Sequence, residues 1–240
     1  MSTAVDSPAP QERANGFVTY LSIIATPRAA FEQLSRTPMW GWAAVLGIIL
    51  TVAATFIMLP EQIHLGHVMQ QQQLAQMTAD QQAQAGPAMA KFEPYAKFTY
   101  IIAALIQPWI GWLIGAVVFL IGAALGGGVP RFRNAWVLAV NAYVISAIAV
   151  IVNAILIAMR GPDAVNSPFD VLALPSLAMV VHGGPKLSAF LYSYGIIYIW
   201  AYVVTFIGLE QLMKMSRTAA LVTTIIFSLL IAGFVMLFAK

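Results

Sequence analysis

Five long stretches without a charged side chain constrain what this chain can fold into. They cover residues 40–59, 99–125, 135–159, 187–209 and 219–239. A helix of about 20 residues crosses the roughly 30 Å of hydrocarbon in a bilayer, and each stretch reaches that length. Lipid offers no partners for backbone N–H and C=O groups, which favours helices. We therefore predict an all-α, polytopic transmembrane bundle of five helices over residues 16–240, preceded by a disordered tail over residues 1–15.

The composition excludes several classes of protein. Hydrophobic residues make up 60% of the chain and charged residues 9%, against about 25% charged residues in soluble domains. The basic residues lie at the ends of the apolar stretches and form no single patch, which argues against a nucleic-acid partner. The chain has no cysteine, so disulfides, thiolate metal sites and a thiol nucleophile are excluded.

The lysines and arginines predict the orientation of the chain, because cytoplasmic loops carry an excess of them. Seven lie on the side that holds the N-terminus and the two short loops, and five lie on the other side. We therefore expect a cytoplasmic N-terminus and, after five spans, a C-terminus on the outer side of the membrane. The seven are Arg13, Arg28, Arg36, Arg131, Arg133, Lys214 and Arg217.

Residues 17–36 have helical periodicity before the first stretch begins. Phe17, Tyr20 and Ile24 recur at helical spacing, and Pro27 occupies the favoured first position of a second helix after Thr26. We predict two short interfacial helices whose apolar faces lie in the headgroup boundary of the inner leaflet. A plain juxtamembrane linker is the alternative.

Two segments on the opposite side have ambiguous patterns. Residues 60–97 are rich in glutamine, so either a helix that ends at Gly86-Pro87 or a low-complexity loop fits the sequence. Residues 169–181 are apolar but contain Asp170 and Pro175, and they are too short to span a bilayer. We expect an interfacial or re-entrant segment there. A sixth span would instead place the C-terminus in the cytoplasm.

The second apolar stretch carries four glycines on one stripe. Gly111, Gly115, Gly122 and Gly126 fall within about 60° of one another around a helix. Small residues on one stripe let another helix approach closely, so we predict that these glycines pack against a neighbour. Pro108 in the same stretch predicts a kink.

The five stretches contain no Asp, Glu, Lys, Arg or His. Proton relays and ion-coupled pumps need ionisable groups inside the membrane, so the sequence disfavours a proton-coupled carrier. Asn141 and Asn153 lie on different faces of the third stretch, where each is typical of hydrogen bonds between helices. We find no catalytic motif, and we expect neither an enzyme nor a cofactor.

Three residues suggest a metal site on the outer face. Glu61, His64 and His67 are spaced by three, so successive pairs share a helical face and could bring imidazole and carboxylate to one ion. A straight helix cannot aim all three at the same ion, and His182 joins them only if the outer loops fold together. His64 and His67 are thus candidate metal ligands, with solvated histidines as the alternative.

Six basic residues border the cytoplasmic headgroup layer in the predicted topology. Each adds roughly 1 kcal/mol to the attraction for anionic lipids, so membrane lipids are the best-supported partner. Ordinary anchoring of the topology is the alternative. These candidate headgroup residues are Arg28, Arg36, Arg131, Arg133, Lys214 and Arg217.

Short motifs along the chain resemble those of a known family. The segment 24–34 (IATPRAAFEQL) precedes the first stretch, Gly127 and Gly128 precede Arg131 and Phe132, and residues 215–221 (MSRTAAL) open the last stretch. Over about residues 17–239 the chain resembles bacterial members of the Yip-one domain family, which is named for eukaryotic relatives that bind Ypt/Rab GTPases.

The resemblance implies five helices, a cytoplasmic N-terminus and no known catalytic centre. Eukaryotic members act in ER–Golgi traffic, but this chain lacks their Asp-Leu-Tyr-Gly-Pro-type motif, so we expect no Rab-type GTPase partner. We expect a membrane scaffold or adaptor that packs against other membrane proteins or against itself.

Two other functions remain open at this point. A small transporter or channel subunit would need a polar-lined cavity that reaches mid-membrane near Gln107, Asn141 or Asn153, whereas a scaffold would have a dry, packed bundle. An outer-face metal-binding protein would use the two histidines.

Overall fold

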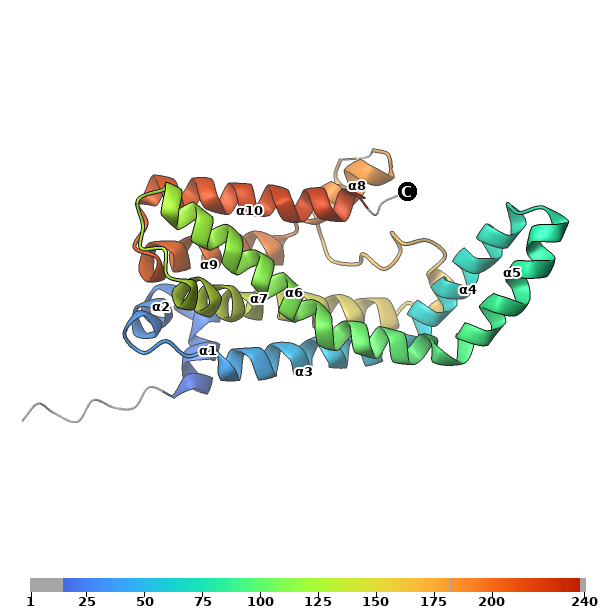
Figure 1. The fold of residues 1–240 in the computed structure, drawn as a ribbon, viewed down its shortest axis with the longest axis horizontal. Coiled ribbons are helices and arrows are strands. Elements are labelled where there is room, and N and C mark those ends of the chain that lie inside the picture. The colour runs from blue at the N-terminus through green and yellow to red at the C-terminus, as the bar shows by residue number, and fades with distance from the viewer. Residues whose placement is uncertain (1–14, 182, 238–240) are drawn as a thin grey trace, which may run out of the picture.

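The computed structural model describes residues 15–181 and 183–237, which form an all-helical fold (Figure 1). These residues contain no β-strand, although one isolated antiparallel bridge joins Ser176 to Gly195. The predicted disordered tail lies, apart from Asn15, outside the described residues. The α-helices are α1 (Gly16–Ala25), α2 (Pro27–Arg36), α3 (Gly41–Ile57), α4 (Leu59–Ala75), α5 (Ala79–Phe92), α6 (Ala96–Leu125), α7 (Phe132–Ala158), α8 (Pro185–Tyr192), α9 (Ile196–Leu212) and α10 (Arg217–Leu237).

The helices form an elongated bundle with two different ends (Figure 1). The N-terminal end carries α1, α2 and the two short connections at 126–131 and 213–216. The hairpin end carries α8, the long connection at 159–184 and a projecting hairpin made of α4 and α5. The helices α3, α6, α7, α9 and α10 run between these ends, so α10 finishes at the end opposite to α1.

The described helices include three that are long and apolar enough to cross a membrane, namely α6, α7 and α10. A fourth candidate is the pair α3 and α4, taken as one span that is bent by 59°. The apolar helix α9 has 17 residues, or about 26 Å at 1.5 Å per residue, so it falls short of a full span. The structure therefore supports three or four spanning helices where the sequence predicts five.

The predicted fourth stretch, 187–209, is divided into α8 and α9 instead of forming one helix. The chain turns at 193–195, where Gly195 bridges to Ser176. A Cβ atom at Gly195 would lie 2.8 Å from the carbonyl oxygen of Pro175, so the close approach requires glycine. This contact with a distant segment, which local periodicity cannot reveal, explains the break.

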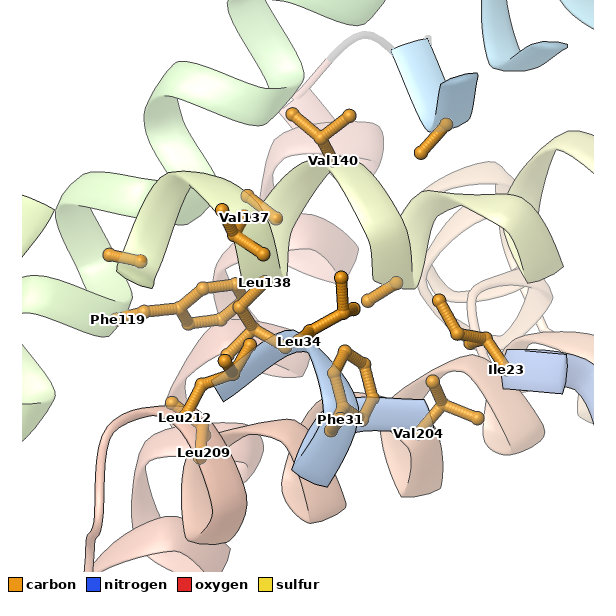
Figure 2. Packing of buried hydrophobic residues seen from close by; sticks show 14 of the residues in the cluster. Ile23, Phe31, Leu34, Phe119, Val137, Leu138, Val140, Val204, Leu209 and Leu212 are labelled. Carbon is orange, nitrogen blue, oxygen red and sulfur yellow. The ribbon is translucent and has the colours of Figure 1, made fainter. Parts of the chain in front are cut away.

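The core of the bundle is centred on α7. This helix packs against α3, α6 and α9, and its inward side chains are mostly small. Figure 2 shows side chains from α2, α6, α7 and α9 meeting in this core. The α9 residue Gly208 makes the closest approach, because a Cβ atom there would lie 2.1 Å from Leu138 of α7.

The apolar face of α2 is not free to lie in the headgroup boundary, as the prediction of an interfacial helix requires. Its apolar residues Phe31 and Leu34 are fully buried in the core formed with α7 and α9. The apolar face therefore closes the N-terminal end of the bundle instead of lying among lipid headgroups. The helix α1 is intermediate, because Ile23 is buried while Phe17 and Val18 are exposed. An interfacial position remains a prediction for α1.

The glutamine-rich segment forms the helices α4 and α5. They are joined by a turn at 76–78, where the side-chain amide of Gln82 donates to the carbonyl oxygens of Leu74 (2.8 Å) and Met77 (3.1 Å). The helix does not end at Gly86-Pro87 as the sequence suggests, because α5 continues through Pro87. The segment 169–181 contains one short 3₁₀ helix, Leu177–Met179, and no spanning helix.

Candidate functional site

The two short connections at the N-terminal end are joined to each other. The backbone N–H of Val129 donates to the carbonyl oxygen of Met213 at 2.7 Å, and the side-chain amide of Asn134 donates to the carbonyl oxygen of Leu212 at 3.0 Å. A Cβ atom at Gly128 would lie 2.7 Å from the same Met213 oxygen. Residues 126–134 and 212–217 thus form one surface, which we call the docked-loop surface.

The three consecutive glycines make this docking possible. Gly127 has a left-handed φ of 71°, and the N–H of Gly128 donates to the carbonyl oxygen of Ala123 at 2.8 Å. This is the Schellman arrangement that ends many helices, and it requires a residue that tolerates positive φ. The glycines therefore form a tight turn after α6.

The structure divides the six candidate headgroup residues into two groups. Arg28 pairs with Glu210 at 3.4 Å, and Arg36 pairs with Glu32 at 2.6 Å on the same helix. The other four lie on or beside the docked loops and are exposed, and within the described ranges none of them has an acidic partner within 4.0 Å. These four unpaired cations are Arg131, Arg133, Lys214 and Arg217.

Lys214 also has an unusual backbone conformation. Its φ is 53°, and no other non-glycine residue among those described has a positive φ. The left-handed region costs an L-residue roughly 1–2 kcal/mol, and glycine is the residue that usually occupies it. The chain therefore keeps a lysine at a position where glycine would be less strained.

An aromatic cluster extends from the docked-loop surface into the bundle. Phe132 stacks on Trp136 with ring centroids 6.1 Å apart, and Trp136 also meets Trp40 (6.0 Å) and Trp109 (6.3 Å). Tryptophan is enriched at the level of the headgroups, because its ring is apolar while its N–H can be hydrated. These side chains therefore suit a surface at the membrane boundary.

The four glycines of the predicted stripe have different surroundings. Cβ atoms at Gly122 and Gly126 would lie 2.4 Å from Thr223 and 2.7 Å from Ala219, both on α10. Gly115 lies at ordinary contact distance from Ala139 on α7 and Phe227 on α10. A Cβ atom at Gly111 would have no neighbour within 4 Å. The close approach to α10 is therefore concentrated at the two glycines nearest the docked loops.

Asn153 holds the hairpin end of the bundle together. Its side-chain amide donates to the carbonyl oxygen of Val171 at 2.9 Å. Its side-chain oxygen accepts from the N–H groups of Ala173 (2.8 Å) and Leu174 (3.3 Å) and from the hydroxyl of Tyr192 (3.3 Å). Three of these partners belong to the loop and one belongs to α8. Asn153 therefore ties the loop and α8 to the end of α7.

Asn141 lies at the N-terminal end, and its amide donates to the carbonyl oxygens of Met39 and Val137, at 2.9 Å in each case. It borders a cavity of about 310 Å³ that is also lined by Gly16 and Trp42. A second cavity of about 230 Å³ lies at the hairpin end. Gln107 is exposed on α6, and Pro108 is buried within that uninterrupted helix.

The first turns of α4 contain a buried polar group. Glu61 is 3% exposed, and its Oε2 atom has no hydrogen-bond partner among the residues that the structure describes. The same is true of the buried Nε2 atom of His64. Within the described ranges, no three His, Asp or Glu side chains gather where they could hold a metal ion, and His182 lies outside those ranges. A metal site at His64 and His67 remains a prediction.

The loop at the hairpin end contains a carboxylate with several donors. Partial burial alone would raise the pKa of Asp170. However, hydrogen bonds from the N–H of Asn166 and from the hydroxyl and N–H of Ser167, together with the charge of Arg160, outweigh burial and hold this pKa below its ordinary value. Asp170 therefore stabilises the turn at 166–170 in its ionised form.

These features define a polytopic helical membrane protein that has a cationic surface at one end. Comparison with known proteins is more specific: the model of the Yip1 domain matches residues 21–239, and the chain belongs to this family, as the resemblance implies. The membrane protein YknW of Bacillus subtilis is 23% identical over 205 residues, which cover 85% of this chain and 82% of that relative. No solved structure shows significant similarity to the chain.

Proposed function

We propose that this chain is a non-enzymatic scaffold or adaptor of the bacterial inner membrane. It crosses the membrane five times, with the 17-residue helices α3 and α9 as the shortest spans, and has its N-terminal end in the cytoplasm and its C-terminus in the periplasm. It acts by packing against other membrane proteins or against copies of itself. The observation that carries this proposal is the packing of the bundle interior, where α7 is surrounded by α3, α6 and α9.

The arrangement of polar groups favours a scaffold over a channel. The two cavities reported above lie at opposite ends of the bundle, and neither is lined by residues from both ends. Asn141 and Asn153 make hydrogen bonds within the chain. A conducting path needs a continuous polar lining. These two side chains instead hold neighbouring segments in place at the two ends of the bundle.

Two measurements test the proposal. Proteoliposomes that contain the purified chain should release ions and small solutes no faster than liposomes without protein. A photo-crosslinking residue at the exposed position Leu229 on α10 should give one discrete protein adduct in native membranes, whereas the same residue at the buried position Ala232 should give none. Solute flux above background, or adducts to lipid alone at Leu229, would contradict the proposal.

A further inference from the structure

The docked-loop surface gathers positive charge that no acidic side chain among the described residues neutralises. The hydrogen bonds Val129–Met213 and Asn134–Leu212 hold two loops side by side, and each loop carries two of the four unpaired cations. The helices α7 and α10 both begin at this surface, at Phe132 and Arg217. The positive ends of their dipoles therefore add to the same potential.

The surface is also apolar between its charges, which indicates what kind of anion it suits. Val129 and Phe132 are 39% and 49% exposed, and Leu125, directly before this surface, is 85% exposed. Phe132 lies between Arg131 and Arg133 in the sequence. A soluble phosphate gains nothing from exposed leucine and phenylalanine. A lipid offers an anionic headgroup and acyl chains at the same place, so it complements both kinds of side chain.

We propose that the docked-loop surface is a binding site for an anionic phospholipid of the inner leaflet, held by Arg131, Arg133, Lys214 and Arg217. This inference rests on the proposed membrane orientation and names the lipid ligand of that end of the protein. It excludes Arg28 and Arg36, because Glu210 and Glu32 already neutralise them.

The strained backbone at Lys214 has a role in this site. A lysine in the left-handed region is less stable than glycine at the same position, so the charge itself accounts for its presence. Replacing Lys214 with glycine removes the cation and relieves the backbone. The loss of the cation weakens lipid binding. The relief of the backbone leaves the folded protein at least as stable as before.

The test uses the full chain in detergent micelles, with native mass spectrometry to measure retained phosphatidylglycerol against phosphatidylcholine with the same acyl chains. The variant R131Q/R133Q should reduce the preference for phosphatidylglycerol at least about tenfold, since each basic residue is worth roughly a factor of five. The matched variant R28Q/R36Q also removes two charges and should change the preference less than about twofold. K214G should reduce the preference with an unchanged or higher melting temperature.

Three results would overturn the lipid site: an equal loss in the two double variants, no loss in R131Q/R133Q, or displacement of phosphatidylglycerol by millimolar inorganic phosphate. The last result would indicate a site for a soluble anion. Solute flux and crosslinking measure the proposed scaffold role separately. A selective lipid site in a protein that conducts ions would leave this inference intact and contradict only the scaffold.

Discussion

The helices α7 and α10 are almost equally apolar but lie in different surroundings. In the most apolar 18-residue segment of α7, 56% of the residues are buried inside the protein, against 28% in the corresponding segment of α10. Packing on α3, α6 and α9 surrounds α7, whereas α10 packs on α6, α8 and α9 and exposes Leu221 and Ile225. Hydropathy therefore identifies both as membrane helices without indicating which one is central.

The polar side chains of the two helices show the same difference. On α7, Asn153 bonds to a loop and to α8. On α10, the hydroxyls of Thr224 and Ser228 donate to the carbonyl oxygens of Ala220 and Ile225 of the same helix, at 2.9 Å in both cases. The central helix thus uses its polar groups to hold other segments, and the peripheral helix satisfies them locally.

The largest expected effect comes from removing the hydrogen bonds of the central helix. Asn153→Ala should lower the free energy of unfolding by about 2–4 kcal/mol, because the N–H groups of Ala173 and Leu174 lose a buried acceptor. Thr224→Val on α10 should cost less than about 1 kcal/mol, since its hydroxyl bonds only to its own helix. Unfolding in detergent measures both values, and equal losses would contradict the comparison.

A bulky residue between α6 and α10 should detach the peripheral helix alone. Gly122→Leu should cost about 1–3 kcal/mol, because Thr223 already occupies the space. The chain has no cysteine, so thiol labelling of Ser228→Cys can report separation of α10 from the bundle. Labelling should increase in the Gly122→Leu background and stay unchanged with Gly111→Leu, where the site is open. The same increase in both backgrounds would refute the assignment of the contact.

The buried carboxylate of α4 predicts a stabilising substitution. Glu61→Gln should raise the free energy of unfolding by about 1–2 kcal/mol, because an amide of the same shape replaces a buried carboxyl group whose Oε2 atom has no hydrogen-bond partner among the described residues. Thermal unfolding at neutral pH measures the change. Glu32→Gln is the control, because this carboxylate is exposed and paired with Arg36, and it should give no gain. A loss of stability in Glu61→Gln would indicate that the carboxylate holds a cation or another partner.

The smallest effect concerns the loop at the hairpin end. The pKa of Asp170 is depressed in the folded protein, so its stabilisation is present above the ordinary carboxyl pKa of about 3.9 and is lost as pH falls through the folded value. The loss is about 1 kcal/mol for hydrogen bonds at a partly exposed site. Below about pH 4, the amides at 166–170 should lose protection against hydrogen exchange, measured relative to their intrinsic exchange rates, and this loss should be absent in Asp170→Asn. A pH dependence that survives in this variant would assign it to another group.

The sequence predicts the class of fold well, because a helix that crosses a membrane needs a long run of apolar residues, and such a run is visible in the sequence. The apolar stretches correspond to α3, α6, α7, α9 and α10, although α3 is bent against α4 and a separate helix precedes α9. The break at 193–195 depends on Gly195 meeting Pro175, and the burial of Phe31 depends on α9. Such contacts join segments that are distant in the chain, so no local pattern contains them.

Only part of the candidate site can be predicted from the sequence, because the rest depends on contacts between segments that are distant in the chain. The sequence identifies six candidate headgroup residues, but only the structure separates Arg28 and Arg36, with their acidic neighbours, from the four on the docked loops. Glu210 is 182 residues away from Arg28. The left-handed backbone at Lys214 has no sequence signature, because a lysine rarely occupies such a position.

The central claim is that the two ends of this bundle lie on opposite sides of a membrane. The test uses two variants, each with a single cysteine: Arg131→Cys on the docked loops and Gln72→Cys on the projecting hairpin. Intact cells are treated with a thiol reagent that does not cross the inner membrane. We expect labelling of the hairpin cysteine in intact cells and labelling of the loop cysteine only after the membrane is opened. Labelling of both positions in intact cells would contradict this topology.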